Sequence, residues 1–188
     1  TELSGRAQAA CIQALVQLYA SLNDEHMAPG FLTAQEQIRA YDPAKHDRAG
    51  GRGEAADHVG PLLVFFELVH IGDTIQLMMQ VFFERLDPGL LGKADFTNAA
   101  VREKRRLESD LDDYVAVGLS AGVELLVQQI EYIVTVHQNP RDFYPETEGA
   151  VDVSQPTAAC MECCATMQTY CDLLAACADK APVSYTHL

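Results

Sequence analysis

Hydrophobic positions recur every three or four residues along most of this chain, and this spacing predicts amphipathic helices. The longest such stretch covers residues 95–134 and contains no proline. It would form a rod of about 60 Å, at about 1.5 Å per residue. A helix of this length needs neighbours to bury its apolar side, because isolated helices are only marginally stable in water. Its apolar positions are Leu107, Leu111, Val115, Leu119, Gly122, Leu126, Ile130 and Ile133.

The first part of the chain also shows the helical spacing, over residues 3–22. A turn is expected after this stretch at Pro29-Gly30, a pair typical of turns. Thr33, with a glutamate three residues later, has the pattern of a capping box for a short helix that ends near residue 41. The chain is therefore predicted to open with an N-terminal helical segment over residues 1–41.

A second main helix is expected from Pro61 to just before residues 87–89, where the sequence Asp-Pro-Gly is a strong stop signal. A helix this apolar is expected to be covered on most sides. Its predicted core positions are Leu68, Ile71, Ile75, Met78, Met79, Phe82 and Phe83. Residues 139–155 contain prolines and glycine and read as a loop, and a last helix is expected over 156–181.

These elements predict an all-α protein, an elongated helical-bundle rod of four main helices plus one short helix. Residues 42–60 are rich in glycine and charge, so they are interpreted as a flexible loop or insertion before a bundle over residues 61–181. Three glycines within the predicted helices, Gly72, Gly118 and Gly122, are interpreted as places where neighbouring helices pack closely, or where the long helix bends.

The net charge of −14 argues against nucleic acid as a direct partner, because phosphate binding requires a basic surface. No apolar run reaches the length of a membrane span, so no transmembrane segment is expected and membrane association would be indirect. A run of cations in the long helix is either an interaction surface or a solvated face paired with nearby carboxylates. It consists of Arg102, Lys104, Arg105 and Arg106.

Five of the six cysteines lie in the last helix, including the run CMECC at residues 160–164. A zinc site needs cysteine pairs in turns, whereas this run lies within a helical pattern without a nearby histidine. We therefore expect no metal and no cofactor, and cysteines that are reduced and packed as small buried hydrophobes. The buried positions expected on this helix are Cys160, Cys164, Met167, Cys171 and Leu174.

His70 lies three residues before Asp73, and such a pair can serve as a general base. No nucleophile or anion-binding loop accompanies the pair, so a core or interface histidine is the preferred interpretation. We expect no catalytic residue and no enzymatic activity.

Four consecutive blocks between residues 61 and 180 carry a resemblance to a known family. They read ELVHIGDTIQLMMQVFFE, DFTNAAVREKRRLESDLDDYVAVGLSAGVELLVQQIEYIV, PRDFYP and DVSQPTAAC. In these blocks the chain resembles the Sec-ten subunit of the exocyst and the recyclin-type F-box proteins that share its helical part. Ala99 and Leu107 depart from the pattern, where the family tends to have proline and phenylalanine. The matching residues are Asp95, Phe96, Asn98, Val101, Glu103, Lys104, Glu108, Leu111, Asp112, Asp113, Gly118, Leu119, Gly122, Gln129, Glu131 and Tyr132.

The resemblance implies a rod of the multisubunit tethering-complex type, in the cytoplasm and at the periphery of secretory vesicles and plasma-membrane sites of exocytosis. It implies contacts with other exocyst subunits, the Sec-fifteen subunit first among them, and no catalysis. The alternative is a recyclin-type adaptor that acts in membrane recycling or recruits a ubiquitin ligase. The chain is expected to be an internal fragment, and residues 182–188 to be a non-native tail that resembles an adapter-derived sequence.

Overall fold

The computed structural model describes residues 5–48, 59–85, 99–140 and 155–180, and the regular structure within them is helical. The elements are, in chain order, α1 (Gly5–Ser21), η1 (Leu22–Met27), α2 (Ala28–Ala40), α3 (Pro43–Arg48), α4 (Gly60–Arg85), α6 (Ala99–Tyr132), η3 (Ile133–His137) and α7 (Ala158–Lys180). The two η elements are π-helical turns, in which the backbone hydrogen bonds reach back five residues instead of four.

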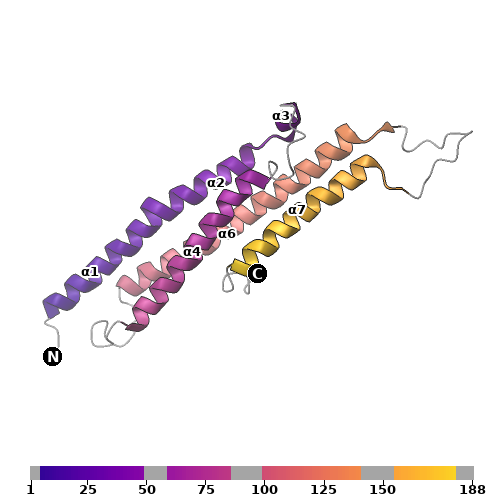
Figure 1. The fold of residues 1–188 in the computed structure, drawn as a ribbon. Helices are drawn as coiled ribbons and strands as arrows, with labels where there is room; N and C mark the ends of the chain where they lie inside the picture. The colour runs from indigo at the N-terminus through magenta and orange to yellow at the C-terminus, as the bar shows by residue number, and fades with distance from the viewer. Residues whose placement is uncertain (1–4, 49–58, 86–98, 141–154, 181–188) are drawn as a thin grey trace, which may run out of the picture.

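The helices lie side by side in an elongated bundle, and successive long helices run in opposite directions (Figure 1). α1, η1 and α2 form one continuous rod that packs along α6, and α2 also contacts α4. α7 contacts α4, α6 and η3, so it lies along the end of the bundle at which α6 finishes (Figure 1). The prediction of an all-α rod of four main helices plus one short helix is confirmed.

The core is built from large side chains of three rods. Phe31 on α2 lies edge-on to Phe65 on α4, with ring centroids 5.9 Å apart. The same Phe31 ring stacks on Tyr114 of α6, at a centroid distance of 5.4 Å. Leu107 and Leu125 of α6 are fully buried along the same side of that helix. These contacts bury an aromatic centre that holds α2, α4 and α6 together.

The expected turn at Pro29-Gly30 is wrong, because both residues lie inside α2. The π turn before them explains the continuity. The Ala28 N–H donates to the Asn23 carbonyl five residues back, so the backbone ladder is already rearranged where Pro29 lacks its own N–H. Thr33 is not a helix cap either, since its Oγ1 donates to the Pro29 carbonyl at 2.8 Å from within the helix.

Part of the stretch expected to be a loop is helical. Residues 43–48 form α3, and the Asp42 carboxylate caps this turn by accepting from the Ala44 N–H at 3.0 Å. The short helix of the bundle is therefore α3 rather than the stretch from Thr33 to residue 41. The expected start of the long helix at residue 95, the stop at residues 87–89, most of the loop at residues 139–155 and the tail at residues 182–188 lie outside the described residues.

α7 faces the bundle with a different stripe from the expected one. Ala159 and Tyr170 are buried, while Cys163, Thr166, Leu173 and Cys177 are half-buried. This stripe is offset by one residue, or about 100°, from the predicted one. Three of the predicted cysteines are exposed, as are Met167 and Leu174. The bulky Tyr170 ring sets the inward face, because its burial removes more apolar area from water than a cysteine does.

α4 is also less covered than expected. Its inward face is Leu62, Phe65, Phe66 and Val69, followed by Met79. Leu68 and Ile75 are half-buried, whereas Ile71, Met78 and Phe82 are exposed, and the Phe83 side chain lies outside the description. The expected covering on most sides is therefore wrong for the second half of this helix within the described chain.

Candidate interaction surfaces

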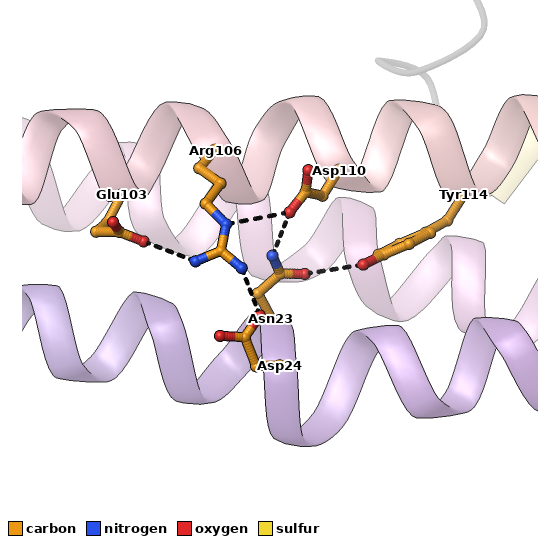
Figure 2. Close-up of polar contacts among 6 residues, drawn as sticks. All are labelled: Asn23, Asp24, Glu103, Arg106, Asp110 and Tyr114. Carbon is orange, nitrogen blue, oxygen red and sulfur yellow. Dashed lines mark hydrogen bonds and ion pairs between the residues drawn. The ribbon is translucent and has the colours of Figure 1, made fainter.

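A polar cluster joins η1 to the middle of α6, at the place where the π turn interrupts the first rod (Figure 2). Asn23 is only 2% exposed, and its Nδ2 donates to the Asp110 carboxylate. Its Oδ1 accepts a long hydrogen bond of 3.5 Å from the Tyr114 hydroxyl. The Tyr114 carbonyl in turn accepts from Gln35 Nε2 at 3.1 Å. Because buried polar groups are costly unless hydrogen-bonded, this cluster fixes the register of the first rod on α6.

Arg106 extends the cluster toward solvent. Its guanidinium lies 2.7 Å from Asp24, 3.4 Å from Glu103 and 3.5 Å from Asp110, and the three carboxylates surround it in Figure 2. Asp24, the nearest of them, is the main cause of the raised pKa of Arg106. Arg106 and Asp24 are 47% and 51% exposed, so the pair contributes no more than about 1 kcal/mol.

The basic run is therefore partly used within the chain. Arg106 binds carboxylates of η1 and α6, and Lys104 pairs with Glu108 one turn later. Arg102 and Arg105 are exposed on the same helix. Arg106 and Lys104 are therefore paired with nearby carboxylates, as one of the two interpretations of this run expected. The other interpretation, that the run is a surface for a partner, remains a prediction.

The phenols near the cluster are held neutral. Burial raises the pKa of Tyr19 from 10.0 to about 12, and the Glu108 carboxylate adds to the effect. Burial also raises the pKa of Tyr114, followed in importance by the charge of Asp110. A phenol with a raised pKa does not supply its anion as a base or nucleophile near neutral pH. The arrangement suits a hydrogen-bonded contact between helices rather than chemistry.

The three glycines singled out in the sequence all lie against other helices. A Cβ built on Gly118 would stand 1.9 Å from Phe65 Cε2, and one on Gly122 would stand 2.9 Å from Leu62 Cδ2. A Cβ on Gly72 would meet Leu111 Cδ2 at an ordinary 3.4 Å. Gly118 and Gly122 thus lie directly beneath α4 side chains. Phe65 occupies the space that a side chain at residue 118 would need.

The cysteines and His70 form no common centre. Among residues 5–48, 59–85, 99–140 and 155–180, no three metal-binding side chains gather as a metal site. Burial, and next the charge of Cys160, raises the pKa of the Cys163 thiol, which makes its thiolate less available. His70 is exposed, so the core interpretation of it is wrong. A contact that the sequence did not suggest joins α7 to η3, where His137 Nδ1 lies 2.8 Å from Glu162.

Large apolar side chains remain on the outside of the bundle. On α4, Leu77 and Met78 are 57% and 67% exposed. α4 and the stretch of α6 with η3 are long and apolar enough to cross a membrane by length and composition alone. A third of the apolar window in each is buried inside the bundle, and core helices of soluble proteins pass the same test. That the chain has no membrane-spanning segment remains a prediction.

Comparisons with known proteins identify a matching family and two relatives of the chain. The family model described as "Exocyst complex component Sec10-like, alpha-helical bundle" matches residues 1–184. Recyclin-1 of Saccharomyces cerevisiae is 27% identical over 183 residues, which cover 92% of this chain and 22% of that protein. F-box protein pof6 of Schizosaccharomyces pombe is 31% identical over 145 residues, which cover 77% of this chain and 16% of that protein. The chain therefore spans about a fifth of the length of these relatives. No solved structure matches the chain.

Proposed function

The chain belongs to the family of exocyst complex component Sec10-like alpha-helical bundles, and we propose that it is a non-enzymatic scaffold that joins other proteins in membrane traffic. In this proposal the rod is part of a subunit that tethers secretory vesicles to the plasma membrane before fusion. It works in the cytoplasm, at the periphery of vesicles and of sites of exocytosis. Its partners are other exocyst subunits, with the Sec-fifteen subunit the first candidate.

One observation carries this proposal beyond the family match. The bundle is held by its own aromatic core and yet leaves large apolar side chains outside, among them Leu77, Met78 and Phe82 of α4. Extended apolar faces of this kind mark protein–protein contacts. The polar cluster at Asn23 binds helix to helix and offers no activated nucleophile. A rigid rod with exposed apolar faces suits binding, and no step of catalysis is needed to explain it.

A second candidate function is a recyclin-type F-box adaptor, which would act in membrane recycling or bring a ubiquitin ligase to its target. The names of the two relatives favour it, since they are called recyclin and F-box protein. The helical bundle would have the same role of holding partners in both candidates. The two candidates differ in the proteins that the whole protein would bind.

Affinity purification tests both candidates. The tagged natural protein is isolated from its own cells, and the proteins that remain bound are identified and quantified by mass spectrometry. We expect the other exocyst subunits in amounts comparable to the tagged protein. Recovery of a cullin-ligase adaptor without exocyst subunits would move the assignment to the recyclin-type function. Recovery of neither set would overturn both candidates.

A further inference from the structure

α6 and the π turn η3 that follows it carry a second stripe of mostly apolar residues on the side away from the bundle. We call it the outer seam, and its members alternate four and three residues apart, as the a and d positions of a coiled coil do. They lie about half a turn around the helix from buried residues such as Leu125 and Gln129. The outer seam consists of Ala116, Ser120, Val123, Val127 and Ile130 of α6 and Val134 of η3.

Most of the seam is exposed in the structure, and Ile130 is half-buried. Val123 is 61% exposed, Val127 47% and Val134 49%, although each has a bulky aliphatic side chain. Valine is a weaker helix former than alanine, glutamate or lysine, the residues expected on a solvated helix face. Single exposed apolar residues are common, but three valines on one heptad seam are a packing surface. The small Ala116 and Ser120 at the other end of the seam would let another helix approach closely.

Charge indicates what fits there. Glu124 and Glu131 follow the d positions Val123 and Ile130, so both border one flank of the seam, and both are exposed. The chain has no lysine or arginine between Arg106 and Arg141. Leu126, on the other flank, is half-buried toward the bundle. The seam is therefore an apolar strip. Glutamates border it on one side, and on the other side it meets residues that pack into the bundle.

We propose that the outer seam is the docking surface for an amphipathic helix of another protein, with apolar residues in heptad spacing and lysine or arginine facing Glu124 and Glu131. This inference rests on the scaffold function proposed above and states the chemistry of one partner. A second copy of the chain fits less well. An antiparallel pair of seams would bring the flanking glutamates of both copies together, and like charges at these positions are repulsive.

Two synthetic peptides of four heptads test the proposal. Both carry isoleucine at a and leucine at d, and one has lysine at e and g where the other has glutamate. Fluorescence anisotropy measures the binding of each labelled peptide to the purified chain. We expect the lysine peptide to bind about tenfold more tightly or better. The double variant Val123→Asn/Val127→Asn should lose that binding, whereas Val64→Asn on α4, a valine off the seam that is about as exposed as Val127, should keep it.

Charge reversal makes the test specific. Glu124→Lys with Glu131→Lys should exchange the preference, so that the glutamate peptide becomes the tighter ligand. Equal binding of both peptides by the unaltered chain, or an unchanged preference in the reversed variant, would overturn the proposal. So would dimers in sedimentation velocity that disappear in Val123→Asn/Val127→Asn.

The peptide assay is independent of the affinity purification. If the peptides do not bind while exocyst or ligase subunits are still recovered, the seam is wrong and the scaffold function stands. If the peptides bind as expected and no subunit is recovered, the scaffold assignment fails and the docking surface remains.

Discussion

Single residues decide how closely these helices approach. Residue 118 has room only for glycine, because Phe65 fills the space beside its Cα. The Phe65 Cε2 lies only 1.9 Å from where a Cβ would be. Phe65 itself is fully buried between Phe31 and Phe66. Its ring cannot swing away without opening the aromatic core. The close crossing of α4 and α6 is thus held by one glycine and one ring.

Gly118→Ala should lower the free energy of unfolding by about 1–3 kcal/mol, because the added methyl overlaps a ring that has no room to move. Gly72→Ala is the matched control. Its Cβ would meet Leu111 Cδ2 at 3.4 Å, an ordinary contact, and alanine in a helix interior gains up to about 1 kcal/mol over glycine. Urea unfolding followed by far-UV circular dichroism measures both. A Gly118→Ala midpoint equal to that of the unaltered chain would show that the crossing is loose.

The buried Tyr19 phenol makes stability depend on pH in the alkaline range. Its pKa is raised from 10.0 to about 12, chiefly by burial, so its contribution is complete below 10.0 and is lost as pH rises toward 12. At about pH 11 the expected loss from this group is on the order of 1 kcal/mol relative to about pH 9. In Tyr19→Phe the decline in unfolding free energy should be smaller by that amount. Urea curves at the two pH values test this, and parallel declines would contradict it.

At the scale of elements, the first rod depends on its π turn. From residue 15 to residue 31 its buried residues fall four apart, which in a regular α-helix of 3.6 residues per turn would make the stripe drift around the rod. The wider π turn takes up this drift and keeps one face on α6. The buried residues of this stretch are Leu15, Tyr19, Asn23, Met27 and Phe31.

Inserting one alanine after Glu25 should separate the two halves of that stripe. The π turn already holds one residue more than a regular α-helical turn, so a second extra residue turns α1 by about 100° relative to α2 and moves Leu15 and Tyr19 out of the core. Losing the burial of two large side chains corresponds to about 3 kcal/mol or more. Glu25→Ala is the control, since it removes only the exposed hydrogen bond from Ser21. Thermal melts of both proteins distinguish the register from the side chain, and equal melts would mean that η1 has no role in alignment.

The same elements show what the sequence could predict. Hydrophobic spacing predicted four long helices correctly, because each apolar side needs a partner whatever its exact phase. It failed at Pro29, where the signal for a turn was strong and the strict four-residue spacing across it was the overlooked sign of a π turn. It failed by one residue on α7, where two neighbouring stripes are both apolar and only the packing of Tyr170 on the bundle chooses between them.

The surface sites could be predicted to a smaller degree. Gly118 was singled out because small residues one turn apart suggest a crossing, but its partner Phe65 lies more than fifty residues away along the chain. The cluster around Asn23 gave no signal, since its members come from η1 and α6 and meet only in the folded rod. The basic run was visible, yet its pairing with Asp24 depends on the same long-range contact.

The described part of the chain is a bundle that has its own buried core and leaves apolar side chains on its outer surface. Tyr19, Phe31 and Phe65 are fully buried, so the rod has a core of its own. Apolar faces remain on α4 and on the outer seam of α6 and η3. Within the long relatives that the chain matches over about a fifth of their length, such faces would meet further helices or partner proteins. The isolated chain presents them to water.

This exposure has a measurable consequence for the isolated chain. Leu77 and Met78 of α4 are 57% and 67% exposed, so the double variant Leu77→Gln/Met78→Gln should change the free energy of unfolding by less than about 0.5 kcal/mol. It should also reduce concentration-dependent self-association in sedimentation velocity, because the apolar patch that drives association is broken. Leu62→Gln, at a position of the same helix that is 3% exposed, should instead unfold the bundle or weaken it by several kcal/mol, on the order of 3. If the double variant destabilised the chain as much as Leu62→Gln, this half of α4 would be part of the core, and the outer apolar face would belong to α6 alone.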